Sequence, residues 1–73
     1  MRARIFLRQP LFVPAGHAPR SAVILEGTVA DVASMGWRVD VERWFAENGQ
    51  ALEGEACTLI VPSAKIDHAL VIG

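Results

Sequence analysis

The middle of the chain has the clearest alternation of apolar and polar residues. From position 37 to position 42 every odd residue is apolar and every even residue is charged. A period of two places one face of a β-strand in a core and the other face in water. We therefore expect two strands, at 21–29 and 37–45, joined by a turn at 31–36.

Shorter alternating or apolar runs predict three further strands, at 2–7, 56–61 and 64–72. The first run resumes at 11–13 but is interrupted by Pro10. Because proline cannot donate a hydrogen bond to a sheet ladder, we expect this first segment at a sheet edge or in an irregular arm.

Turn residues divide the chain at short intervals. Gly27 lies inside the strand expected at 21–29, where glycine favours a β-bulge or a tight bend. Asn48 and Gly49 form a tight-turn dipeptide. Short strands with turns every 8–12 residues or so are typical of a sandwich or barrel, and closure removes exposed strand edges. We expect one all-β domain over residues 1–73: a small five-stranded antiparallel β-barrel with little or no helix.

Composition favours association with other chains. A chain of 73 residues buries a small core, and its only cysteine, Cys57, allows no internal disulfide. Two scattered histidines and one cysteine predict no metal site, and we expect no cofactor. Hydrophobic residues make up 52% of the chain before glycine is counted, against about 45–50% with glycine included in a typical domain. Some of them must be exposed, so we expect a homo-oligomer.

Charge is distributed unevenly. Residues 1–20 contain four arginines and no acid (+4), while residues 21–73 contain three basic residues and eight acids (−5), for a net charge of −1. The basic segment either binds an anion or pairs with acids elsewhere in the fold. No apolar run is long enough to span a bilayer, and a single cysteine suits a reducing compartment, so we expect no membrane partner and a cytoplasmic protein.

Two spaced elements are similar to a known family pattern. Arg4 and Arg8 form an Arg-x-x-x-Arg element, and Asp31 to Gly36 approximates an Asp/Asn-x-Ser-x-x-Gly element between two strands. In this the chain resembles the PilZ domain, a small bacterial β-barrel. Ser34 stands one place later than the serine of the family pattern, and Ala33 takes that position.

The PilZ resemblance implies binding of cyclic di-GMP. Arg4 and Arg8 would then clamp its phosphates and guanine edges, because guanidinium groups present planar forks to such acceptors. Asp31, Ser34 and Gly36 would form the turn that approaches the base closely.

A second resemblance concerns the order of segments. A bent strand, a turn with aspartate, a strand, a variable loop and the segment 59–68 together are similar to Sm-like and SH3-like barrels. That resemblance implies a ring whose last strands join subunits and bind RNA, with Lys65 and His68 at the partner surface. The net charge of −1 argues against a general nucleic-acid binder, which normally has a basic face.

Aromatic and ionisable residues complete the set of candidates. Trp37 is in phase with the valines of its strand, so we expect it in the core. Trp44 is out of phase with them, so we expect it at a partner surface. Alternation sends Asp67 and His68 to opposite faces, so we expect no catalytic pair and no enzyme.

The expected function is a non-catalytic binding or interaction module. Its forms are a shortened PilZ-like sensor of cyclic di-GMP, an Sm-like or SH3-like barrel that binds RNA, or a structural homo-oligomeric accessory protein without a small ligand.

Overall fold

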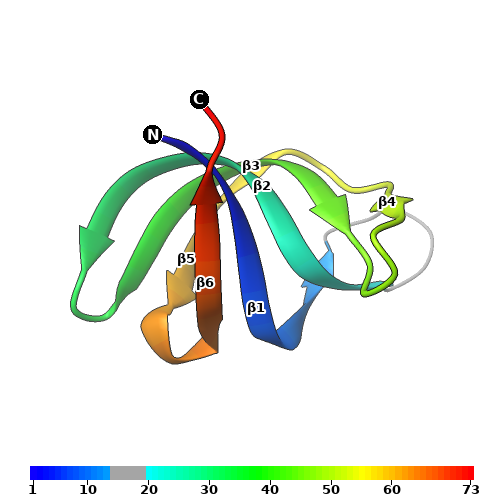
Figure 1. The fold of residues 1–73 in the computed structure, drawn as a ribbon, viewed down its shortest axis with the longest axis horizontal. Helices are drawn as coiled ribbons and strands as arrows, with labels where there is room; N and C mark the ends of the chain where they lie inside the picture. Colours follow the sequence, from blue (N-terminus) through cyan, green and yellow to red (C-terminus); the bar gives the residue numbers. More distant parts are fainter. Residues whose placement is uncertain (14–19) are drawn as a thin grey trace.

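One antiparallel sheet contains all the strands that the structure describes (Figure 1). The computed structural model describes the backbone of residues 1–13 and 20–73. Within these residues a 3₁₀ turn, η1 (Ser63–Lys65), is the one helical segment. The strands are β1 (Arg2–Val13), β2 (Arg20–Ala33), β3 (Gly36–Phe45), β4 (Ala51–Leu52), β5 (Cys57–Pro62) and β6 (Ile66–Val71).

The sheet is open, with β3, β2 and β1 in its middle. Its order is β4-β3-β2-β1-β6, and β5 pairs with β3 as well. The all-β prediction is confirmed, but the described residues form a six-stranded open sheet where a closed five-stranded barrel was expected. The chain leaves β5 at Pro62 and turns a corner through η1 before β6 begins, so these two strands are not joined by a hairpin. Figure 1 shows β2 and β3 arching together over the molecule, with β5 lying behind β6.

The position of β1 differs from the prediction. Its first half pairs with β2 on one side and with β6 on the other, so it is an inner strand rather than an edge. Pro10 nevertheless lies where the ladder is interrupted, as expected for a residue without a backbone N–H. It lies in a register shift between Phe6 and Leu11, where β1 makes no ladder pairs with β2.

The predicted irregularity at Gly27 is confirmed. The register between β2 and β3 shifts between Glu26 and Gly27, and β3 has one extra residue there, Glu42. A side chain at Gly27 would overlap the carbonyl oxygen of Asp40. The missing side chain therefore lets the two strands approach closely where the sheet bends.

The same bulge decides which tryptophan is in the core. Val39 and Val41 point inward, and the extra Glu42 shifts the phase so that Trp44 points inward too. Trp44 is only 1% exposed, and its Nε1 donates a hydrogen bond to the Glu55 carbonyl oxygen at 3.2 Å. The prediction of Trp44 as a partner surface is therefore wrong. Trp37 is half-buried and packs against the same core.

Candidate functional site

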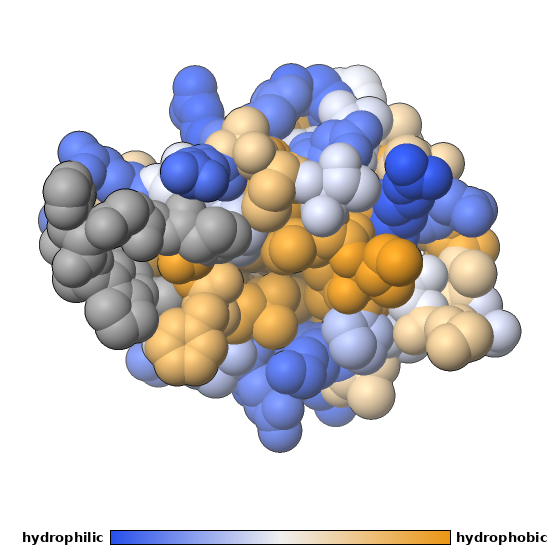
Figure 2. Space-filling view, turned by 180° about the vertical axis from the view of Figure 1, so that it is seen from behind, coloured by the Kyte–Doolittle hydropathy of each residue, from blue (hydrophilic) through white to orange (hydrophobic). Residues whose placement is uncertain are grey.

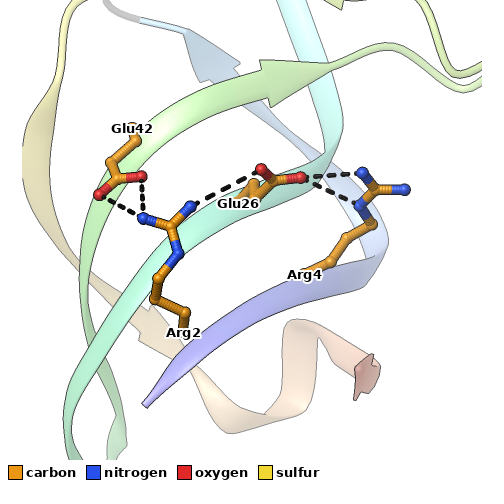
Figure 3. A network of polar contacts seen from close by, with 4 residues as sticks. All are labelled: Arg2, Arg4, Glu26 and Glu42. Atoms are coloured by element: carbon orange, nitrogen blue, oxygen red, sulfur yellow. Dashed lines mark hydrogen bonds and ion pairs between the residues drawn. The ribbon is translucent and has the colours of Figure 1, made fainter. Parts of the chain in front are cut away.

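Arg2 and Arg4 at the start of β1 form ion pairs with acids of β2 and β3 (Figure 3). Arg2 lies between two carboxylates: its Nη1 donates to Glu42 at 2.8 and 3.1 Å, and its Nη2 lies 3.9 Å from Glu26. Arg4 donates to Glu26 through two nitrogens, at 2.9 and 3.2 Å, and its guanidinium lies 5.3 Å from the ring centre of Phe45. Two positive and two negative charges cancel here. Of the two alternatives for the basic segment, Arg2 and Arg4 therefore follow the second: they pair with acids of the same fold.

The fold does not gather the residues expected to bind cyclic di-GMP. Arg4 lies opposite Glu26 in the ladder, and Asp31 is five residues farther along β2, or about 16 Å at the usual rise per residue. Arg8 lies beyond Phe6 in the other direction, and its Nε donates to the carbonyl oxygen of Ile66 at 3.2 Å. Within one chain both arginines are therefore remote from the 31–36 segment.

The turn itself is shorter than predicted. The β2–β3 hairpin ends in a two-residue turn, Ser34 and Met35, and residues 31–33 belong to β2. A second register shift lies between Val29 and Asp31, where Ala30 is one extra residue of β2. Ser34 is exposed at the tip and is not among the residues that line the adjoining hollow.

A first hollow, of about 340 Å³, lies beside this hairpin tip. Asp31 and Gly36 line it, as do Arg38, which faces Asp31 in the ladder, and two strongly exposed apolar side chains. The expected turn residues therefore border a surface with one acid and one base. Sequence reasoning missed Arg38, although its place on the polar side of the alternating strand could have drawn attention to it. The full lining is Asp31, Ala33, Met35, Gly36, Arg38 and Ile60.

A second hollow, of about 470 Å³, lies where β1 and β2 separate. Phe6 forms part of its wall, and the Phe6 ring stacks on His68 with ring centres 4.4 Å apart and planes 10° from parallel. Arg8 and Glu47 bring opposite charges to the same hollow. Sequence reasoning singled out Arg8 and His68 but missed Phe6 and Glu47, which come from segments whose proximity depends on the fold.

The Asp67–His68 pair also departs from the prediction. Asp67 Oδ2 lies 2.7 Å from His68 Nδ1, so the two side chains meet although they are neighbours in a strand. The register between β1 and β6 shifts here: Phe6 faces His68 and Leu7 faces Ile66, which leaves Asp67 as the extra residue of a bulge. The bulge redirects Asp67, and the expectation of opposite faces is wrong.

Lys65 is half-buried in η1, next to the start of β6, whereas the His68 side chain is 57% exposed. The two residues are three positions apart, and the register shift at Asp67 lies between them. The structure does not gather them with Trp44, which is in the core.

Cys57 is a half-buried free thiol on β5. Burial raises the pKa of its thiol, and the nearby Glu55 carboxylate raises the pKa further by disfavouring the thiolate. We predict that alkylation by iodoacetamide, followed against pH, has a midpoint above that of a short unstructured cysteine peptide, and that Glu55→Gln lowers this midpoint slightly. A midpoint below that of the peptide would contradict the assignment.

Among the described residues, no cluster of three or more His, Cys, Asp or Glu side chains could hold a metal ion. The same residues include no helix that is both long and apolar enough to cross a membrane. No family model, curated protein or solved structure matches this chain.

Proposed function

We propose that this protein is a non-catalytic interaction module that assembles with copies of itself through two free sheet edges. The observation that carries the proposal is that, among residues 1–13 and 20–73, β5 pairs only with β3 and β6 pairs only with β1. In this part of the chain no ladder pairs β5 with β6. A row of unpaired N–H and C=O groups is a template for a strand from another chain.

Exposed apolar side chains on these strands support the same proposal. Ile60 on β5 is 73% exposed, and Leu70 and Val71 on β6 are 52% and 66% exposed. Figure 2 shows the side opposite to that of Figure 1, on which apolar side chains gather around a hollow in the middle of the surface, with hydrophilic groups at its margins. Contiguous apolar surface of this kind is typical of interaction sites.

The two edges differ, which constrains the assembly. If β5 of one copy pairs with β6 of the next, each copy offers one edge of each kind, and the contact is heterologous. Such contacts close into a ring when the rotation between copies permits it. A bent β2, a turn, β3, the segment 46–56 with the short β4, and then β5, η1 and β6 follow one another along the chain. This order includes the one for which the Sm-like and SH3-like resemblance was noted. A barrel-like ring of this class is the form that we propose.

A proline on the free side of β6 tests the proposal. Ile72 donates its N–H to the Arg2 carbonyl oxygen, so the alternation of an antiparallel ladder directs the N–H of Val71 away from β1. Val71→Pro removes this outward donor without breaking a bond to β1. We expect light scattering to show a mass close to that of one 7.9 kDa chain, with an unchanged far-ultraviolet circular dichroism spectrum.

Two matched variants serve as controls. Val71→Ala keeps the outward N–H and should retain more of the assembly than Val71→Pro. Leu70→Pro removes an N–H that points toward β1 and should destabilise the folded chain itself. The proposal fails if Val71→Pro assembles as fully as the unaltered protein.

The PilZ-like form of the function has less support. Arg4 is already paired with Glu26, and neither Arg4 nor Arg8 lies near Asp31 or Gly36 within one chain. We expect calorimetry with cyclic di-GMP to show no heat of binding. Binding that Arg4→Ala abolishes would favour the PilZ-like form instead, and steeply salt-dependent retention of RNA would favour RNA binding.

A further inference from the structure

The hollow between β1 and β2 results from a local opening of the ladder. Phe6 pairs with Ile24 and Leu11 pairs with Ala22, so residues 7–10 of β1 face the single residue Val23 of β2. The surplus residues of β1 bow away from β2. The volume left there, about 470 Å³, is within the range of about 300–1,000 Å³ found for small-molecule sites.

The walls of this hollow combine a fixed aromatic ring with two opposite charges. The ring of Phe6 is held in place by its stack on His68. Arg8 is anchored through Nε to the Ile66 carbonyl oxygen, and no described residue accepts a hydrogen bond from its two terminal nitrogens, which can face a ligand. No ion pair joins Arg8 to Glu47 within the described part of the chain. The remaining lining residues are Leu7, Pro10, Val23 and Ile24.

We infer that this hollow binds a small zwitterion with a flat apolar group, of the class of free aromatic amino acids. The guanidinium of Arg8 offers a planar fork to a carboxylate. The carboxylate of Glu47 offers acceptors to an ammonium group, and the ring of Phe6 with the apolar wall accommodates an aromatic side chain. A simple anion would meet repulsion from Glu47, and a neutral apolar ligand would leave both charges without a partner.

No lining residue of the hollow belongs to β5 or β6, but His68 and Ile66 of β6 contact Phe6 and Arg8. Glu47 lies in the turn after β3, away from both edges. The Glu47→Gln variant therefore separates a failure of ligand binding from a failure of assembly.

Calorimetry with dissected ligands tests the site group by group. The probes are L-phenylalanine, phenylacetate without the ammonium group, phenethylamine without the carboxylate, and L-alanine without the ring. We expect L-phenylalanine to bind, and we expect removal of either charged group to weaken binding by about tenfold or more. Loss of the ring should weaken binding by a similar factor.

Matched variants connect each ligand group to one side chain. Arg8→Gln should weaken L-phenylalanine about tenfold but leave phenethylamine unchanged. Glu47→Gln should weaken L-phenylalanine by a similar factor without weakening phenylacetate. Phe6→Leu should weaken every ligand that has a ring. Arg43→Gln, a control at an exposed arginine that lines neither hollow, should bind all four probes as the unaltered protein does.

Several results would overturn the inference. These are no binding of L-phenylalanine at about 10 mM, equal binding of L-alanine, or equal affinity of the Glu47→Gln variant for L-phenylalanine. Glu47 is exposed in a turn, so this variant should fold even if Phe6→Leu does not. Tighter binding of guanosine monophosphate than of L-phenylalanine would also overturn it and would assign the hollow to a nucleotide.

Discussion

Gly27→Ala is expected to destabilise the folded protein by about 3 kcal/mol or more, because it puts a methyl group where two strands touch. The added carbon would overlap the carbonyl oxygen of Asp40 and press on the backbone of Val41. Neither neighbour is a flexible side chain, so relief requires that β2 and β3 separate at the bulge. Unfolding in urea, followed by circular dichroism, measures the effect.

A second glycine provides the control for this substitution. A side chain at Gly73 would lie 3.7 Å from carbons of Arg2, which is ordinary contact. Gly73→Ala should therefore leave the free energy of unfolding nearly unchanged. Because a small domain is stable by only about 5–15 kcal/mol in total, Gly27→Ala should be clearly separable from it. Equal stability of the two variants would mean that β2 and β3 are not in contact at this bend.

Trp44→Ala is expected to cost about 3–5 kcal/mol, the usual penalty for removing a large buried aromatic side chain. The indole is among the largest fully buried side chains, and it also donates the hydrogen bond to the Glu55 carbonyl oxygen. Loss of the ring leaves a cavity under the loop that follows β4 and leaves this oxygen without its indole donor.

The other tryptophan of β3 is the natural comparison. Trp37 is half-buried, so Trp37→Ala should cost clearly less than Trp44→Ala in the same unfolding experiment. The reverse order would show that the phase of the strand does not change at Glu42 and that Trp44 is the exposed ring.

This pair of tryptophans also shows how far the sequence alone could predict the fold. Period-two alternation correctly predicted a strand at 37–42, because the charged residues there face water. One extra residue in a strand reverses every side chain that follows. The only sign of the bulge at Glu42 in the sequence is Gly27 on the partner strand. The bulge at Asp67 has no glycine or proline beside it in the sequence that could have indicated it. The faces of Trp44 and Asp67 were therefore predicted wrongly.

The candidate sites were harder to predict than the strands. The arginines at the start of the chain were visible as a cluster, but their partners Glu26 and Glu42 are fixed by ladder registers between distant segments. The hollow beside Phe6 likewise joins residues of β1, β2 and the turn after β3. Spacing along the chain could not indicate that Arg8 and Glu47 share one hollow.

The mass of the unaltered protein in solution tests the central claim of self-assembly most directly. Light scattering over a range of concentrations should show one dominant species with a mass several times that of the 7.9 kDa chain. A mass of one chain at every concentration would contradict assembly through the free edges of β5 and β6.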